Sequence, residues 1–130
     1  MPIIFYHPTE DLIGVSQKVA QHIDIMPTVL AYLNYDKPYF AFGKDLLSDE
    51  SDDYAISYTS STYQFVNGDM LLYFNGQNII GAYSYKTDSL LKNNFVDQND
   101  FAGSKHEQLL KGIIQQYHNR MIDDKLIPEK

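Results

Sequence analysis

The chain has 130 residues, of which 44% are hydrophobic, so it is long and apolar enough to build a real core. Its net charge of −7 and its lack of a cluster rich in lysine or arginine exclude nucleic acid as a partner. The absence of cysteine excludes disulfides, thiolate catalysis and cysteine zinc sites, and no apolar window approaches the ~20 residues of a membrane span, so we expect this chain to be soluble.

The chain opens on a short apolar run, Pro2 to Tyr6, which is typical of a β-strand covered on both faces. His7-Pro8 ends this strand, because Pro8 lacks the N–H that a strand would donate. Natural termini usually lie on exposed, frayed segments, whereas this chain begins on a candidate core strand. We therefore expect it to be a piece of a longer polypeptide.

A helix is predicted over residues 26–33. Its apolar side chains recur at helical spacing and predict that one whole side of the helix is buried; they are Met26, Val29, Leu30 and Leu33. Pro27 suits the first turn, and Asp24 stands where a carboxylate can accept a free backbone N–H. Asn34 tolerates the left-handed conformation that ends helices. Residues 39–43 are aromatic-rich and fit either a short strand or a packed loop.

Strand-like segments follow, rich in aromatic and β-branched residues, at 54–59, 63–66, 70–74 and 78–85. Asn67-Gly68 and Asn75-Gly76 separate the last three of these segments. Asn-Gly between apolar runs is the strongest short-range signal of a β-hairpin. The pattern therefore predicts an antiparallel meander of three or four strands.

The last predicted element is a helix that begins with the capping box Ser104-x-x-Glu107. Its wide apolar stripe must lie on another element, most simply the meander; the stripe consists of Leu109, Leu110, Ile113, Ile114, Tyr117 and Met121. The predicted class is α+β. Residues 1–53 are expected to supply one strand and one helix, and residues 54–130 to form the meander with its carboxy-terminal helix.

The four histidines do not form a metal-ligand pattern, since none pairs with another at ligand spacing; they are His7, His22, His106 and His118. His106 and His118 are expected at the surface. His22 with Asp24 is the one pair that could support metal or acid–base chemistry, and we favour capping and packing for both. Ser57, Ser60, Ser61 and Thr62 lie close together, but no nucleophile elbow surrounds them.

An acidic run lies before the meander and is interpreted as a solvated loop rather than a cation site; its members are Asp45, Asp49, Glu50, Asp52 and Asp53. The eleven tyrosines could form a face that stacks on sugars, but tyrosines at alternating strand positions are more often part of sheet packing. No catalytic, cofactor-binding or metal-ligating residue is therefore predicted.

Several segments, taken in order, resemble the carboxy-terminal part of the sulfatase family. They are residues 2–8 (PIIFYHP), 15–17 (VSQ), 23–30 (IDIMPTVL) and 43–47 (GKDLL). Within the alkaline phosphatase superfamily, the chain is most similar to the lipoteichoic-acid-synthase-like branch, which contains phosphoglycerol transferases. The resemblance covers residues 2–47 and extends to the meander only in general layout. It implies that residues 1–53 are the carboxy-terminal end of a larger, sulfatase-like α/β core and complete its edge.

The resemblance implies a metal-dependent parent enzyme, a hydrolase or transferase that acts on sulfate or phosphate esters through a Thr, Ser or modified Cys nucleophile. The nucleophile and the metal ligands of that family precede the segment that this chain matches, so the chain is expected to be non-catalytic and to bind no cofactor itself. Asp24, Pro27 and Thr28 match a helix-start motif of the family, whose role is structural. The parent is expected to hold a divalent metal, and to anchor an extracytoplasmic catalytic domain in a membrane.

The expected partner is the remainder of the parent catalytic domain, and self-association through an exposed core edge is a second possibility. An alternative function is a stand-alone binding module that uses a tyrosine-rich sheet face for glycans or lipid head groups. A third is a purely structural subdomain, in which residues 2–6 and the stripe of the helix at 26–33 remain exposed.

Overall fold

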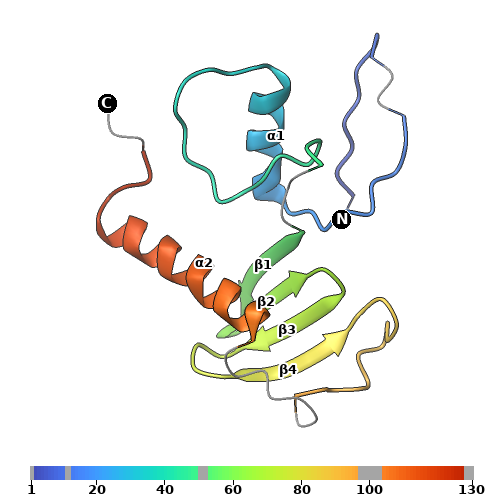
Figure 1. The fold of residues 1–130 in the computed structure, drawn as a ribbon, viewed down its shortest axis with the longest axis vertical. Helices are drawn as coiled ribbons and strands as arrows, with labels where there is room; N and C mark the ends of the chain where they lie inside the picture. The colour runs from blue at the N-terminus through green and yellow to red at the C-terminus, as the bar shows by residue number, and fades with distance from the viewer. Residues whose placement is uncertain (1, 11–12, 50–52, 97–103, 128–130) are drawn as a thin grey trace.

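The sheet of this protein is a simple meander of four antiparallel strands in the order β1-β2-β3-β4 (Figure 1). A computed structural model describes residues 2–10, 13–49, 53–96 and 104–127. The strands are β1 (Tyr54–Thr59), β2 (Thr62–Asn67), β3 (Met70–Phe74) and β4 (Ile79–Ser84). The helical elements are the short 3₁₀ turn η1 (His22–Asp24), α1 (Ile25–Tyr32) and α2 (Lys105–Ile122). The predicted α+β class and the meander packed on a helix are confirmed.

The hairpin turns differ in detail from the prediction. Asn67 pairs with Met70, so the loop between β2 and β3 consists of Gly68 and Asp69 rather than Asn67 and Gly68. Asn67 remains in the strand, where its side-chain amide donates to the carbonyl of Asp53 at 3.1 Å. Asn75-Gly76 lies in the β3–β4 turn as predicted, and the Asn75 side-chain oxygen accepts the N–H groups of residues 77 and 78.

The β1–β2 turn is built from Ser60 and Ser61, which both have positive φ angles, of 52° and 59°. Two consecutive positive φ angles are the mark of a type I′ turn, whose twist matches that of the flanking strands. These two serines were weighed as candidate nucleophiles, and the structure gives them a turn-forming role.

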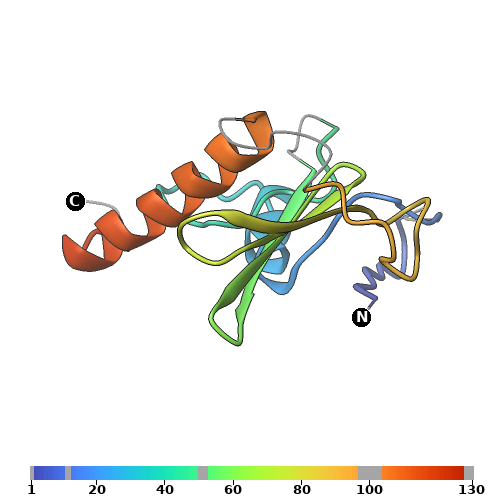
Figure 2. The same ribbon diagram turned by 90° about the horizontal axis from the view of Figure 1, so that it is seen from below.

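One face of the sheet forms the core together with the first half of α2 (Figure 2). Directly opposed residues share a face of an antiparallel sheet, which places the core residues of neighbouring strands side by side. The buried members are Phe65, Leu72, Phe74, Ala82 and, from the helix, Leu110. Ser104 caps α2 as predicted, since its hydroxyl accepts the Glu107 N–H at 3.2 Å.

The apolar stripe of α2 is only partly buried against the sheet. Leu110 is buried and Ile113 and Ile114 pack on the core, whereas Met121 is 50% exposed. Beyond the sheet, α2 meets the loop before β1 instead: the ring of Tyr117 lies 5.4 Å from that of Phe42. The wider burial predicted for this helix is therefore wrong for its second half.

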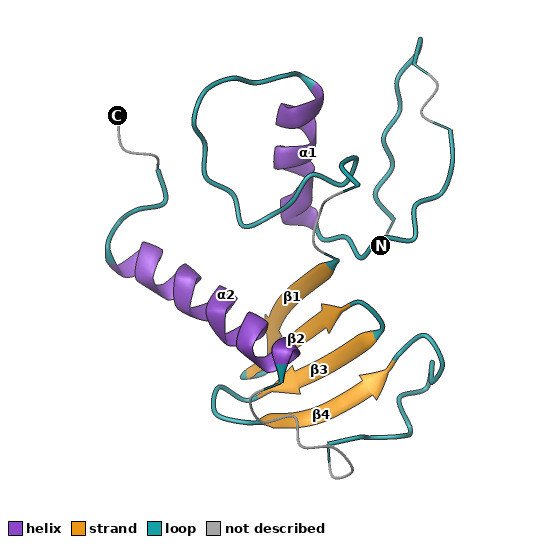
Figure 3. Cartoon of the chain, viewed as in Figure 1, coloured by secondary structure: helices purple, strands orange, loops and turns teal. Residues whose placement is uncertain are grey.

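The region before β1 consists largely of loops around α1 (Figure 3). Residues 2–6 are extended but belong to no sheet among the described residues, so the predicted core strand is unpaired here. Residues 39–43 form a packed loop, the second of the two predicted options. Among the described residues, no helix is long and apolar enough to cross a membrane.

Helix α1 ends where predicted but does not bury the predicted side. Asn34 has a φ of 52°, and its N–H bonds the carbonyl of Ala31 while that of Tyr35 reaches Leu30, which is a Schellman cap. Of the predicted stripe, Met26 is 46% and Leu33 is 66% exposed. The prediction of a buried side is therefore wrong for this chain, because no described element covers that side of the helix.

Candidate functional site

The carboxylate of Asp24 is the most completely buried charged group among the described residues, with no exposed surface. It ends η1 and turns back to accept the Gln21 N–H at 2.8 Å through Oδ2. Oδ1 accepts the N–H of Lys44 at 3.0 Å, and the Lys44 ammonium lies 3.3 Å from Oδ2. Charge-assisted hydrogen bonds of this kind offset the cost of burying a carboxylate.

Lys44 is nearly as well enclosed, with a side chain that is 10% exposed. Its ammonium also donates to the carbonyl of Tyr54 at 2.6 Å and lies 4.9 Å from the centre of that ring. Asp24 and Lys44 together therefore join the start of α1 to the first residue of β1.

Thr28 makes the second connection between α1 and the loop at 43–47. Its hydroxyl donates to the Asp24 carbonyl at 2.6 Å and accepts the Leu46 N–H at 2.9 Å. A threonine in the first turns of a helix can bond the carbonyl four residues earlier in this way. Pro27 lies in the same turn and is buried, and its missing N–H costs no bond so close to the helix start.

Gly43 is required by close packing at this point. A Cβ atom at this position would lie 2.0 Å from the carbonyl oxygen of Ile23, far inside any allowed contact. We call this set the Asp24 cluster: Asp24, Thr28, Gly43, Lys44 and Leu46. It brings together two of the segments that carry the family resemblance, residues 23–30 and 43–47.

The geometry of the Asp24 cluster suits architecture better than chemistry. Both carboxylate oxygens are occupied by donors from this chain, and among the described residues the only cation in contact is the Lys44 side chain. The side chain of His22, the partner weighed for Asp24, is exposed and makes no hydrogen bond among the described residues. The structure therefore gives the Asp24 carboxylate a structural role, in which it accepts the N–H groups of Gln21 and Lys44 and does not cap α1.

The other histidines serve local structure. The Nδ1 atom of His7 accepts the Glu10 N–H at 3.0 Å, and His118 is exposed on α2. His106 is half-buried, so its predicted surface position is wrong: its Nδ1 lies 2.8 Å from Oδ1 of Asn67. Because the Asn67 amide nitrogen already donates to Asp53, its oxygen faces the ring, and Nδ1 of His106 must carry the proton.

The described members of the acidic run each contact a different partner and do not form one cluster. Asp53 accepts the Val19 N–H at 2.6 Å, Asp45 accepts the Leu47 N–H at 2.9 Å, and Asp49 lies 3.9 Å from the Lys18 ammonium. Glu50 and Asp52 lie outside the described residues. Where the structure describes the chain, no three His, Asp or Glu side chains come together in a way that could hold a metal ion.

The tyrosines are distributed over several elements. On the sheet, Tyr58 is 61% exposed, while Tyr63, Tyr73 and Tyr83 are half-buried in contacts with neighbouring rings. The other exposed tyrosines lie before β1 or on α2: Tyr6, Tyr32, Tyr35, Tyr39 and Tyr117. This distribution favours packing over a single aromatic binding face.

Comparison with known proteins adds no relative to this picture. No protein-family model matches the chain, and no curated protein matches it. The function must therefore be argued from the geometry itself.

Proposed function

We propose that this chain is a non-catalytic, carboxy-terminal portion of a sulfatase-like, metal-dependent enzyme, a hydrolase or a phosphoglycerol-type transferase acting on sulfate or phosphate esters. Its role is to complete the edge of the catalytic domain. The nucleophile and the divalent metal belong to the remainder of the parent, which is also its binding partner. The parent carries the membrane anchor, and the catalytic domain lies outside the cytoplasm.

The observation that carries this proposal is the Asp24 cluster. A buried carboxylate beside a histidine in the sequence would be the natural candidate for catalysis, yet its oxygens are bonded to Gln21 and Lys44. The residues of the Asp-x-x-Pro-Thr element instead hold the loop at 43–47 against the start of α1. Contacts of this kind give the segment a fixed shape with which it can dock on the remainder of the parent, and they have no role in catalysis.

The apolar surfaces around the cluster support the same role. Met26 and Leu33 of α1 and Ile4 of the opening segment are exposed, although residues of this kind normally lie inside a protein. Exposed apolar residues gathered in this way mark surfaces that meet another protein. The remainder of a catalytic domain would cover both the helix and the extended segment.

The proposal is tested by assaying the purified chain with aryl phosphate, phosphodiester and sulfate ester substrates in the presence of Mg²⁺, Mn²⁺, Ca²⁺ or Zn²⁺. We expect no turnover above buffer. Turnover that disappears in the variants Asp24→Asn or His22→Gln would contradict the proposal, because it would place catalysis in this chain.

A second test concerns the parent. The coding sequence upstream of Met1 is expected to encode an Asp-His-Gly motif within a few dozen residues of it, and a Thr, Ser or Cys nucleophile further upstream. An upstream sequence that continues in frame without these motifs would remove the family from the proposal.

A further inference from the structure

The opening segment, residues 2–7, has the side-chain alternation of a β-strand although it pairs with no other strand among the described residues. Ile3, Phe5 and His7 are half-buried, whereas Ile4 and Tyr6 are 83% and 84% exposed. Successive side chains of a strand point to opposite sides in this way. We call this segment the N-terminal arm.

The backbone of the N-terminal arm is also without a strand partner among the described residues. Within the part of the chain that the structure describes, residues 2–7 take part in no backbone–backbone hydrogen bond. An extended segment with open N–H and C=O groups is a template for pairing with another strand. The side chains also indicate that a neighbouring strand is missing, because an extended run that is apolar on both sides normally lies inside a sheet.

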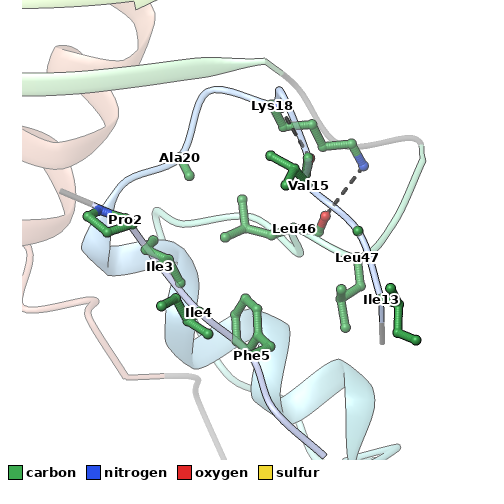
Figure 4. A pocket seen from close by; sticks show the side chains of 12 residues that line it. Pro2, Ile3, Ile4, Phe5, Ile13, Val15, Lys18, Ala20, Leu46 and Leu47 are labelled. Carbon is green, nitrogen blue, oxygen red and sulfur yellow. Dashed lines mark hydrogen bonds between the residues drawn. The ribbon is translucent and has the colours of Figure 1, made fainter. Parts of the chain in front are cut away.

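A hollow beside the N-terminal arm offers room for such a strand. It has a volume of about 840 Å³ and lies between residues 2–5 and residues 13–18, with Leu46 and Leu47 drawn between the two (Figure 4). Lys18 is the one charged side chain among the described residues that line it, and it donates to the carbonyl of Ser48 at 2.6 Å. The other lining side chains are apolar except that of Ser16, while polar groups still make up a large share of the surface of the hollow.

The charge distribution permits a second copy of this chain to approach here. The net charge is −7, yet residues 2–8, 13–17 and 25–33 contain no Asp, Glu, Lys or Arg. Like-charge repulsion between two copies is therefore lower at these segments than at the acidic run of residues 45–53. The second copy also brings what the first lacks, namely an unpaired apolar strand.

We propose that two copies of this chain associate through their N-terminal arms, which pair antiparallel about Ile4 in a symmetric dimer. Pairing about this residue sets Ile3 opposite Phe5 of the second copy, so apolar groups meet throughout. A two-fold axis makes the contact self-complementary and closed. Each arm then lies in the hollow of the other copy and covers Ile13 and Val15.

The inference does not rest on the proposed function: it concerns this chain by itself, in which the surface that a parent enzyme would cover is open to a second copy. It is tested by sedimentation velocity on the 130-residue protein over a range of concentrations. We expect a concentration-dependent monomer–dimer equilibrium and slowed hydrogen exchange at the amides of residues 3–6 in the dimer. Ile4→Lys should raise the dissociation constant about tenfold or more, because it places a charge in an apolar contact.

Two further variants distinguish the proposed contact from nonspecific hydrophobic association. Ile122→Lys changes an equally exposed isoleucine, at 81%, on α2 and should leave the dissociation constant unchanged. Ile4→Pro removes a backbone N–H and should weaken the dimer as Ile4→Lys does, while both variants keep the exchange protection of the sheet. A monomer at every concentration, equal effects of the two lysine variants, or a dimer untouched by Ile4→Pro would overturn the inference. None of these outcomes bears on the assays of catalysis.

Discussion

The sheet with α2 and the region around α1 are stabilised in opposite ways. The first buries Phe65, Leu72 and Leu110 completely, although the end of α2 leaves Met121 and Ile122 exposed. The second buries Asp24 and Thr28 completely and leaves Met26 and Leu33 exposed. A region with a polar interior and an apolar exterior joins its parts to each other but does not complete a core. The comparison indicates that the sheet and α2 form a core of their own, whereas the α1 region has an apolar surface that another part of a protein would cover.

The largest effect is expected from Phe65→Ala, which should destabilise the sheet by about 4 kcal/mol through lost burial and a residual cavity. Urea unfolding followed by near-ultraviolet circular dichroism measures this loss. Leu90→Ala, at a residue that is 71% exposed, is the control and should cost less than about 0.5 kcal/mol. Equal costs for the two variants would mean that the sheet face does not form the core.

Gly43→Ala tests the other region and should cost about 2 kcal/mol, because the new methyl group overlaps the Ile23 carbonyl and forces the backbone apart. Gly112→Ala is the matched change on α2, where nothing lies within 4 Å of the new atom. It should stabilise the protein by about 1 kcal/mol, the difference in helix propensity. Thermal unfolding of both variants checks the pair, and a loss at Gly112 as large as that at Gly43 would contradict the close approach.

A smaller gain is expected from replacing Ser60-Ser61 by Asn-Gly. Both serines adopt the left-handed conformation, which is unfavourable for residues other than glycine and asparagine. Asn-Gly adopts it at a lower cost in free energy, so the change should stabilise the sheet by about 1 kcal/mol. The midpoint of urea unfolding measures the gain. No change, or a loss, would show that the turn residues are not strained.

The smallest effect concerns Lys86, which forms an ion pair with Asp69 in the β2–β3 turn. The hydrogen bond to Asp69 raises the pKa of Lys86 above its ordinary value of 10.5. A raised folded-state pKa means that the pair favours folding below pH 10.5 and that this contribution is lost as the pH rises through the folded-state pKa. Asp69→Asn should return the pKa of Lys86 toward 10.5, as followed by NMR titration of its side chain, and an unchanged pKa would contradict the pairing.

The sheet was predictable because its signals are local. The runs of aromatic and β-branched residues, the Asn75-Gly76 turn and the Ser104 cap each operate within a few residues, and all three are confirmed. The position of the Asn67-Gly68 turn was wrong because Asn67 bonds residues distant in sequence, Asp53 and His106, which hold it in the strand.

The α1 region was harder to predict for a different reason. Helical periodicity identified its apolar side correctly, but periodicity carries no information about what covers that side. The bond between Asp24 and Lys44 spans twenty residues and follows no local pattern, so residue spacing could give Asp24 only a capping role. The predicted cap of α1 is wrong, since the Asp24 side chain accepts no N–H of that helix. It accepts the N–H of Gln21 before η1, and its bond to Lys44 emerged only from the fold.

The most direct test of the architectural role of Asp24 is native-state hydrogen exchange in the variant Asp24→Asn. The change keeps the shape of the side chain and removes its charge. We expect the amides of Lys44 and Leu46 to lose about 2 kcal/mol of protection, the value of a hydrogen bond to a charged group, while those of Phe65 and Leu72 keep theirs. Unchanged protection at Lys44, or an equal loss in the sheet, would contradict the account.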